Sequence, residues 1–356
     1  MLKLLNGLKN EIPKRSVAYF SSGSLHKDYQ ATGANLIEID RGDGNYLKKF
    51  NSVWHNLRDR AAQCQPDIIH SQLPQTNLLT SFALKSMGVP IILSERGVGR
   101  TRPFWEKALR SLAYSRVDAF VTNSKVTRKR MINREKLTPS QVRIIPNIVD
   151  LQIPLPESLL GLRKKLGLPE NSTLITAVGG LRQVKGYDVL LDAFAILHKT
   201  HDNINLLIVG EGPERQLLEK KINSLQLQNS VCLSGYRDDI ADILAISDIY
   251  ISSSFSEGQS NSILEAMASS LPIIGTAVGG TPDLLRNGEA GILVPPRDSK
   301  AIAKALDVFL KDESERDRLA VKSEQYISTA HSSKSVADEY VKFYHEVIAE
   351  YKRKHA

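Results

Sequence analysis

Cysteine is scarce in this sequence, with only Cys64 and Cys232 in 356 residues. Two thiols exclude a disulfide framework and a cysteine-rich metal site, so both are expected to be small buried hydrophobic side chains. Long apolar runs are absent as well: no transmembrane-length stretch occurs, and the first residues lack the apolar core of a secretory signal. These absences predict a cytoplasmic protein.

Charge is distributed unevenly over a chain that is long enough for two domains. Hydrophobic residues make up 42% and charged residues 24%, as in globular proteins. The net charge of +8 hides an asymmetry, because residues 1–150 carry 24 basic and 12 acidic side chains, whereas the remainder carries 23 and 27. The first half is therefore strongly basic and the second slightly acidic.

The basic charge is densest between Arg96 and Arg143, where thirteen basic residues accompany only three acidic ones. Such a segment can meet an anionic membrane surface or a phosphorylated substrate, which would make the protein peripheral on the inner face of the membrane. A solvated helical face is the plain alternative. No nucleic-acid partner is expected, because the segment lacks interleaved aromatic residues and a recognisable reading motif.

Short β-branched runs alternate with helical periodicity along the whole chain. This alternation is typical of parallel sheets with crossover helices, and runs this short suit strands that are buried on both faces. The expected strands are 16–20, 35–39, 67–70, 90–93, 119–122 and 142–145 in the first half, and 173–178, 205–209, 231–233, 249–252, 272–275 and 291–294 in the second. We therefore predict an α/β protein with two doubly wound, Rossmann-like sheets.

A proline-rich segment divides the two halves. Three prolines within residues 145–156 interrupt the periodicity and forbid a central strand. We expect an N-terminal domain over residues 1–150 and a C-terminal domain over residues 151–330. Apolar residues recur at helical spacing near the end of the chain, so residues 331–356 are expected to form a helix that packs back toward the N-terminal domain.

The N-terminal domain is expected to lack its first strand. A Rossmann-like half opens with an apolar strand and a glycine-rich turn, because only glycine lets the backbone approach a phosphate closely. Here Leu2, Leu5 and Leu8 recur at helical spacing before the first expected strand. The sequence thus begins as if inside the first crossover helix, and the absence of the turn bears on activity.

A glycine turn follows the first strand of the second half. Residues 173–178 lead into the turn 179–186, which carries Arg182 and Lys185. Cations beside a glycine turn can neutralise the charge that accumulates on a departing phosphate, so the turn suits a pyrophosphate. Exposed loop cations without a ligand are the alternative.

A second polar turn follows strand 249–252. Residues 258–262 precede a helix whose first amides can bind an anion. Glu257 lies before that helix and Glu265 about two turns later, so the two carboxylates can accept hydrogen bonds from separate hydroxyls of one sugar ligand. A capping Glu257 and a surface Glu265 are the alternative. Both turns follow strands of one open sheet, at the edge where such folds bind ligands.

With these motifs in this order, the sequence resembles glycosyltransferase family 4, whose members have the GT-B fold of two facing Rossmann-like domains with a cleft between them. The resemblance runs from about Ser16 to the C-terminus. Its motifs are the Glu-x7-Glu element from Glu257 to Glu265, Lys185-Gly186, Val209-Gly-Glu-Gly-Pro213, Gly235-Tyr-Arg-Asp-Asp239, Gly279-Gly280 and Ile145-Pro-Asn147. Several are ordinary alone, but their order is specific.

The resemblance implies that residues 1–150 form the acceptor-side domain and residues 151–330 the nucleotide-sugar donor domain. It also implies roles for individual residues. Lys185 and Arg182 would contact the donor diphosphate, Glu265 the ribose hydroxyls and Glu257 the transferred sugar. The remaining donor-binding residues would be Gly180, Gly258, Gln259 and Ser260 near the phosphates, and Tyr236 and Arg237 near the nucleobase. Similar enzymes retain the anomeric configuration without a metal or other cofactor, and the leaving phosphate itself takes the acceptor proton.

The sequence departs from the family pattern in two places. Many relatives have arginine directly after the first glycine of the turn, whereas this chain has Gly180 there and Arg182 two positions later. The N-terminal domain of relatives usually carries a histidine after the strand that corresponds to residues 90–93, where this chain reads Ser94-Glu-Arg-Gly97. Arg96 could stabilise sugar or phosphate charge instead. His70 follows another strand, and either touches the acceptor or is structural.

The expected activity is that of a retaining, metal-independent glycosyltransferase. It would move a hexose-type sugar from a nucleoside diphosphate sugar to a glycan or lipid-linked acceptor, in the synthesis of cell-surface polysaccharide or glycoconjugates. Two alternatives stay open: an inactive binding or scaffold protein of the same fold, and a sugar-nucleotide epimerase. The sequence specifies neither the nucleotide nor the acceptor.

Overall fold

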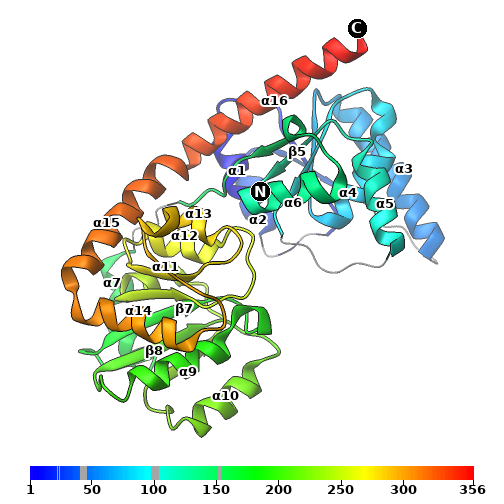
Figure 1. Cartoon of the computed structure of the whole chain (residues 1–356). Coiled ribbons are helices and arrows are strands. Elements are labelled where there is room, and N and C mark those ends of the chain that lie inside the picture. The colour runs from blue at the N-terminus through cyan, green and yellow to red at the C-terminus, as the bar shows by residue number, and fades with distance from the viewer. Residues whose placement is uncertain (22, 24, 41–45, 98–103, 151–153) are drawn as a thin grey trace. The chain divides into compact units, whose positions relative to one another are not determined.

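A computed structural model describes residues 1–21, 23, 25–40, 46–97, 104–150 and 154–356 (Figure 1). The chain divides into two compact units, which we call the first and the second unit. The first unit consists of Met1–Ile148 together with Ser333–Ala356, and the second of Val149–Ser332. Both are α/β units in which every strand pair is parallel.

The strands of the first unit form two sheets. Strands β1 (Ser16–Tyr19) and β2 (Asn35–Glu38) pair with each other, and β3 (Ile69–Gln72), β4 (Ile91–Glu95), β5 (Ala119–Thr122) and β6 (Val142–Ile144) pair in that order. The sequence predicted one doubly wound sheet here. The parallel α/β architecture is as predicted, but among the described residues the strands form two sheets, because β1 and β3 do not pair and each has a strand neighbour on one side only.

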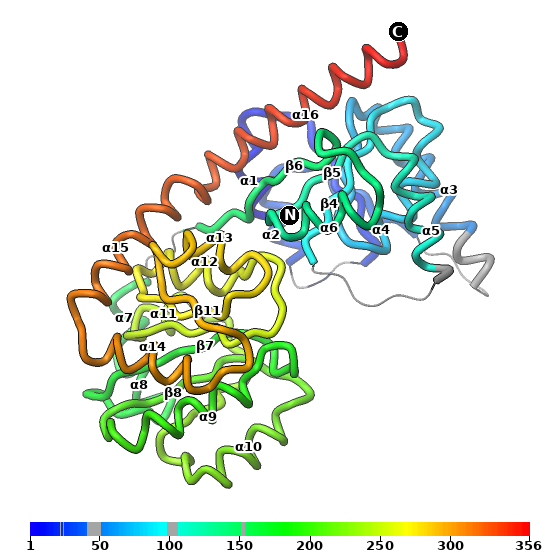
Figure 2. The backbone as a smooth tube through the Cα atoms, in the orientation of Figure 1, coloured from blue at the N-terminus to red at the C-terminus, as the bar shows by residue number. Residues whose placement is uncertain are grey.

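Helices cover both sheets of the first unit. They are α1 (Leu2–Gly7), α2 (His26–Ala31), α3 (Tyr46–Cys64), α4 (Pro74–Ala83), α5 (Phe104–Tyr114), α6 (Lys125–Glu135) and α16 (Ser333–His355), with 3₁₀ turns at Lys85–Met87 and Pro139–Gln141. The first and last helices pack together here, since Leu4 of α1 and Leu8 directly after it are buried in one cluster with Tyr340 and Tyr344 of α16. Figure 2 shows α16 running beside α1.

The second unit has one six-stranded sheet in the order β12-β11-β10-β7-β8-β9. Its strands are β7 (Thr173–Val178), β8 (Ile204–Val209), β9 (Val231–Gly235), β10 (Ile249–Ser252), β11 (Ile273–Thr276) and β12 (Ile292–Val294). The chain starts at the central β7, adds β8 and β9 on one side, and returns to the other side of β7 with β10. The loops after β7 and β10 therefore meet at the point where the strand order reverses, which is where open α/β sheets bind ligands.

Helices lie on both faces of this sheet. They are α7 (Pro156–Leu159), α8 (Leu162–Lys165), α9 (Tyr187–Leu197), α10 (Arg215–Ser224), α11 (Ile240–Ala245), α12 (Asn261–Ala268), α13 (Thr281–Leu284), α14 (Ser299–Lys311) and α15 (Glu313–Ala330), with 3₁₀ turns at Gln183–Lys185 and Arg286–Gly288. Side chains alternate between the faces along each strand. Ile249 and Ile251 are buried in the cluster with α9 and α14, whereas Tyr250 between them is buried with α12.

Every strand that the sequence predicted is present, with its ends within two residues of the predicted ones. Strands such as β5, β8 and β10 are buried along their whole length and read as short apolar runs, whereas β1 and β2 keep exposed residues. Among the described helices, none combines the length and the apolar character that crossing a bilayer requires.

Candidate functional site

The turn after β7 is shaped by a glycine that no other residue could replace without strain. The chain passes from Gly179 through the 3₁₀ turn Gln183–Lys185 to Gly186 and then enters α9. Gly186 has a φ of +63°, and a Cβ on it would lie only 2.3 Å from the carbonyl oxygen of Ser253. Glycine therefore allows this turn to approach the loop that follows β10.

Backbone and side-chain hydrogen bonds join these two loops. The amide of Phe255 donates to the carbonyl of Val184 at 2.7 Å, and the Ser253 hydroxyl donates to the carbonyl of Lys185 at 2.9 Å. Both partners in the first loop lie within the 3₁₀ turn. The backbone that carries Lys185 is therefore held against the loop that carries Glu257 before either side chain is considered.

The Lys185 and Glu257 side chains form an ion pair between the two loops. Lys185 Nζ lies 2.6 Å from Glu257 Oε1, and the Ser254 hydroxyl donates to the same oxygen at 2.7 Å. The two side chains keep 23% and 13% of their exposure, so the pair is screened from bulk water without being enclosed. Glu257 Oε2 makes no hydrogen bond to any residue that the structure describes, which leaves it available to accept one from a ligand.

The loop after β10 is held from its other side by the loop after β11. Gly279 has a φ of +57°, and a Cβ on it would lie 1.7 Å from the carbonyl oxygen of Glu257. The amide of Gly280 donates to the carbonyl of Gly258 at 2.7 Å. The Glu257 loop is therefore held on one side by the Lys185 turn. On the other side it is held by Gly279-Gly280, the glycine pair that the resemblance singled out.

Helix α12 begins immediately after this loop. Ser260 is its N-cap, and the buried Ser260 hydroxyl accepts from the amide of Ile263. Glu265 lies in the second turn of the helix and is half-buried. Both Glu257 and Glu265 act on the Tyr250 hydroxyl: burial raises the pKa of Tyr250, and the two carboxylates raise it further. Both carboxylates belong to the segment that follows β10, Glu257 in the loop and Glu265 in α12.

Three other residues predicted on the donor side, Arg182, Tyr236 and Arg237, differ in their exposure and in their partners. Arg182 is exposed, and its side chain has no hydrogen-bond or ion-pair partner among the residues described. Tyr236 follows β9, two strands from β7, and is 79% exposed. Arg237 forms a bidentate pair with Asp239, which raises the pKa of the guanidinium and lowers that of the carboxylate. Binding of a nucleobase by Arg237 would therefore have to compete with Asp239.

In the first unit, His70 and Arg96 are both bonded to tyrosines of α16. His70 Nδ1 lies 2.7 Å from the Tyr344 hydroxyl, and Nε2 lies 2.7 Å from the Ser94 hydroxyl. Arg96 donates to the Tyr340 hydroxyl and to Asn147 Oδ1, each at 3.0 Å. Burial, and then the charge of Arg96, lower the pKa of His70 to about 3, so its ring is neutral. Contact of either residue with an acceptor stays a prediction.

Two family models match the chain, and each match lies largely within one of the two units. A family model described as "Glycosyl transferases group 1" matches residues 161–326, and a second described as "Glycosyltransferase Family 4" matches residues 9–153. Together these two matches account for most of the chain. The chain belongs to glycosyltransferase family 4.

Relatives of this family 4 chain include named transferases. It is 28% identical over 207 residues to the N-acetyl-alpha-D-glucosaminyl L-malate synthase of Bacillus anthracis, a match that covers 58% of this chain and 54% of the relative. It is 27% identical over 316 residues to the D-inositol 3-phosphate glycosyltransferase of a Nocardioides species, covering 79% and 69%. The chain thus spans only about half the length of the first relative.

Solved structures share the architecture of the family 4 chain. Anabaena HepE in complex with UDP superposes with a TM-score of 0.84 over 96% of this chain and 94% of HepE, at 19% identity. HepE has also been solved in complex with UDP-glucose, with a TM-score of 0.82. At this level of identity the likeness shows the GT-B fold of two Rossmann-like units.

The sequence did not reveal the residues that support the Lys185–Glu257 pair in this family 4 chain. Ser254 bonds the carboxylate directly. The hydroxyl of the buried Tyr187 donates to the carbonyl of Gly179 at 3.1 Å, and burial raises the pKa of that hydroxyl. The one feature of the sequence that could have indicated this role of Tyr187 is its position directly after the Lys185-Gly186 motif. Ser254 gave none, because serine is common after strands.

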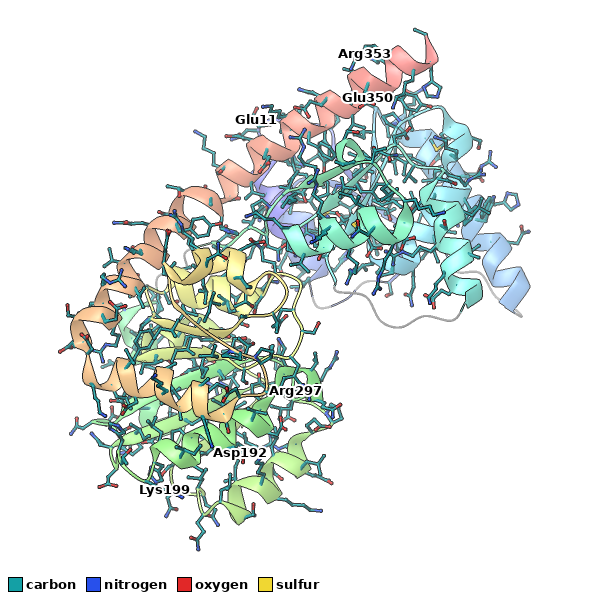
Figure 3. The ribbon with its side chains drawn as sticks, viewed as in Figure 1. Glu11, Asp192, Lys199, Arg297, Glu350 and Arg353 are labelled. Carbon is teal, nitrogen blue, oxygen red and sulfur yellow. The ribbon has the colours of Figure 1, made fainter. Side chains whose placement is uncertain are left out.

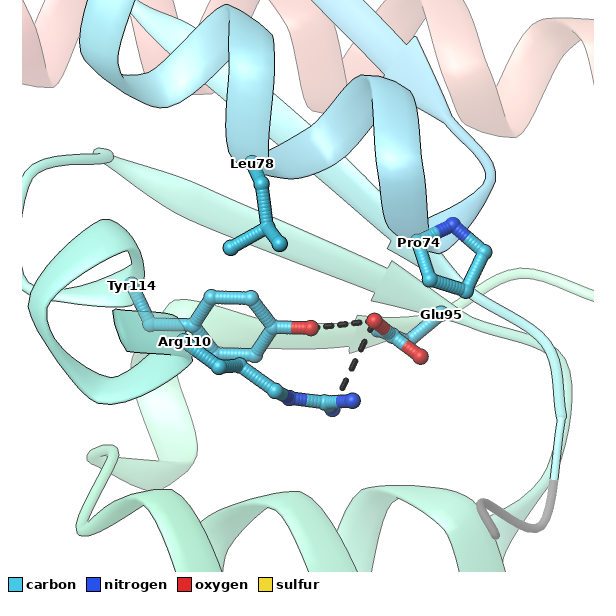
Figure 4. Close-up of a pocket in the computed structure, with 5 residues that line it drawn as sticks. All are labelled: Pro74, Leu78, Glu95, Arg110 and Tyr114. Carbon is cyan, nitrogen blue, oxygen red and sulfur yellow. Dashed lines mark hydrogen bonds and ion pairs between the residues drawn. The ribbon is translucent and has the colours of Figure 1, made fainter. Parts of the chain in front are cut away.

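The residues of the segment Ser94-Glu-Arg-Gly97 contact other residues of the first unit. One oxygen of Glu95 accepts from the Tyr114 hydroxyl and lies 3.4 Å from Arg110 Nη2 (Figure 4). The Arg110 guanidinium also lies over the Tyr114 ring, 4.6 Å from its centroid. Pro74 and Leu78 complete the lining of the small pocket around this group. Together with the contacts of Ser94 and Arg96, this explains why the segment is polar without requiring a ligand.

The basic segment between Arg96 and Arg143 contains arginines with partners in the first unit and other cations that are exposed. Its paired arginines bind acidic side chains or carbonyls of the first unit; they include Arg96, Arg110, Arg128, Arg130 and Arg143. Its exposed cations include Lys107, Lys125, Lys129, Arg134 and Lys136. Leu109 and Leu112 of α5 are exposed as well. Part of the positive charge is therefore structural, and the rest faces solvent.

Over the described residues, no three His, Cys, Asp or Glu side chains gather as a metal site requires.

Proposed function

We propose that this protein is a retaining glycosyltransferase that moves a hexose-type sugar from a nucleoside diphosphate sugar to a glycan or lipid-linked acceptor, without a metal. The observation that carries this proposal is the Lys185–Glu257 pair, which lies where the strand order of the second sheet reverses. The UDP and UDP-glucose bound by HepE favour a uridine nucleotide as the donor. Similarity to the lipopolysaccharide core biosynthesis glycosyltransferase LpsE of Rhizobium meliloti favours a place in cell-surface glycoconjugate synthesis.

The chemistry of transfer fits the charges of this pocket. The bond between the anomeric carbon and the β-phosphate oxygen breaks, and the diphosphate leaves with the bonding electrons. The ammonium of Lys185 and the guanidinium of Arg182 would stabilise the negative charge that develops there, which is the part that a metal plays in other transferases. The acceptor oxygen bonds to the anomeric carbon from the same side, and its proton passes to the departing phosphate.

Glu257 and Glu265 would hold the two ends of the donor. Oε1 of Glu257 is already occupied by Lys185 and Ser254, so Oε2 is the atom that would accept from a sugar hydroxyl. Glu265 would accept from the ribose, while the amides of Gly258, Gln259 and Ser260 approach the phosphates. Lys185 would then contact both the sugar-binding carboxylate and the phosphate, because an ammonium has three donors.

Surface charge and exposed apolar side chains support the acceptor side of the proposal. The exposed cations of the basic segment, together with Leu109 and Leu112, suit a peripheral protein on an anionic membrane that offers a lipid-linked acceptor. Sedimentation with liposomes tests this part: we expect more protein to pellet with anionic than with neutral lipid, and less of it after the exposed Lys129 and Lys136 are changed to Gln. Equal recovery with both lipids would contradict it.

The whole proposal is tested by incubating the protein with UDP-glucose and other nucleotide sugars, with and without acceptor glycans, and by measuring both the nucleotide released and the fate of the sugar. A transferase or a slow donor hydrolase releases nucleoside diphosphate. An epimerase would convert the donor without releasing nucleotide. A scaffold protein would leave the donor unchanged, whether or not it binds it. Conversion of the donor without nucleotide release, or an unchanged donor, would contradict the proposal.

A further inference from the structure

We propose that Arg297 is a positioning residue of the donor site, acting through Phe255 on the turn that carries Lys185. This inference rests on the proposed function, since it concerns the same pocket. Arg297 belongs to the loop between β12 and α14, two strands away from β10 in the sheet. Figure 3 labels its side chain in the second unit.

The backbone of Arg297 is in a conformation that arginine rarely adopts. Its φ is +64°, in the left-handed region, and it follows Pro295 and Pro296 in a turn. Such turn positions favour glycine or asparagine, because a Cβ is crowded there. A strained residue that persists beside a binding pocket suggests that its side chain has a function that a glycine would lose.

The contact that the Arg297 side chain makes is with an aromatic ring. Its guanidinium carbon lies 4.1 Å from the centroid of Phe255, which is stacking distance. The side chain is exposed, and it has no hydrogen-bond or ion-pair partner within the described parts of the chain. The structure therefore uses this arginine to cover one face of Phe255.

Phe255 contacts the turn that carries Lys185. A Cβ on Gly186 would lie 2.7 Å from Phe255 Cε1, so the ring is in close contact with the backbone directly after Lys185. The Phe255 amide bonds the carbonyl of Val184, directly before Lys185. Phe255 is also two residues before Glu257 in the chain. One aromatic residue thus contacts the turn on both sides of the cation and shares a loop with the carboxylate.

The consequence is a chain of contacts from Arg297 to the charged pair. With the guanidinium in place, the Phe255 ring is covered on its outer face and held against Gly186, which keeps Lys185 Nζ within 2.6 Å of Glu257. Without it, one face of the ring is exposed, and the ring and the turn gain freedom. A looser turn binds a diphosphate more weakly, because ordering it is then part of the cost of binding.

The test compares UDP binding by isothermal titration calorimetry in the full chain and in Arg297→Gly, Arg297→Lys, Phe255→Leu and Arg297→Gly/Phe255→Leu, with GDP titrated in parallel. We expect Arg297→Gly to weaken nucleotide binding about fivefold and Arg297→Lys, which can still cover the ring, to restore most of it. The double variant should bind no more weakly than Phe255→Leu, because both changes break the same contact. The Tm of Arg297→Gly should not fall, since glycine suits a φ of +64°.

Three results would overturn the inference while leaving the proposed function intact: unchanged nucleotide binding in Arg297→Gly, a loss of equal size in the wild-type and Phe255→Leu backgrounds, or a loss that comes with a lowered Tm. The second would mean that Arg297 contacts the nucleotide directly, and the third that its role is structural. If the unsubstituted chain binds neither UDP nor GDP, the proposed function itself fails.

Discussion

Lys185 and Glu257, which are 72 residues apart in the sequence, meet at 2.6 Å between the loops that follow β7 and β10. An ion pair of this kind does not require a ligand to exist. Its place at the reversal point of the sheet, the glycines that let the loops approach and the unused Oε2 of Glu257 together give it the form of a binding site. Substitutions at this site should therefore separate ligand binding from stabilisation of the fold.

Replacing Lys185 with Ala should lower kcat for sugar transfer by about 100-fold or more, because the cation that stabilises the leaving diphosphate is removed. UDP binding should weaken in parallel. Lys199→Ala, at an exposed lysine of the same unit, is the matched control and should leave both unchanged. Steady-state kinetics of nucleotide release checks this, and a Lys185→Ala enzyme with normal kcat would show that the cation plays no part in the reaction.

Glu257→Gln should separate nucleotide binding from turnover. The variant keeps an acceptor for Lys185 and Ser254 but turns the second oxygen into a donor, so a sugar hydroxyl can no longer donate to it. We expect UDP affinity within about twofold of the unsubstituted chain and a kcat about 100-fold lower. The exposed Glu289→Gln is the control. Loss of UDP affinity together with turnover would place Glu257 at the nucleotide instead.

Gly279→Ala and Gly167→Ala form a matched pair that tests how the Glu257 loop is held. Both glycines have a positive φ, but a Cβ would clash only at Gly279, at 1.7 Å from the Glu257 carbonyl oxygen, whereas nothing lies within 4 Å of the one at Gly167. Backbone strain alone should cost about 1 kcal/mol at Gly167, and strain with the clash about 3 kcal/mol or more at Gly279. Thermal unfolding measures both, and equal losses of stability would mean that the loop moves freely away.

Stability should depend on pH through His70. Its pKa falls from 6.5 to about 3 in the folded chain, because burial and then Arg96 disfavour the charged ring. Between these two pH values the unfolded chain binds more protons, so the free energy of unfolding should decrease as the pH is lowered from about 6.5 toward 3, by no more than about 1.4 kcal/mol per pH unit.

The His70→Gln variant checks the source of this pH dependence. Urea unfolding between pH 4 and pH 7 should show a flatter profile for His70→Gln than for the unsubstituted chain. The exposed His345 lies on the helix that carries Tyr344, and His345→Gln should keep the original slope. An unchanged slope in His70→Gln would assign the effect to another group.

The sequence predicted local features well and long-range contacts poorly. Many of the strands were recognisable because burial makes them short apolar runs, and the two polar turns because they follow such runs. That Lys185 bonds Glu257, and that Arg96 bonds Tyr340 of the last helix, depends on how distant segments pack. Sequence spacing carries no information on either distance.

Two further features could not be predicted for related reasons. The separation of β1–β2 from β3–β6 depends on which strands pair, which the apolar pattern does not specify. Arg237 was expected near a nucleobase, but the structure pairs it with Asp239, because two residues of opposite charge at this spacing in a turn can reach each other. A polar residue in a motif can satisfy its own neighbour as readily as a ligand.

A crystal structure of the chain with the nucleoside diphosphate that raises its Tm most would test the central claim directly. The account predicts density for the diphosphate within hydrogen-bonding distance of Lys185 Nζ and for the ribose beside Glu265, with Glu257 Oε2 facing the position of the sugar. A nucleotide bound elsewhere on the chain, with the Lys185–Glu257 pair unchanged and untouched by it, would contradict the account.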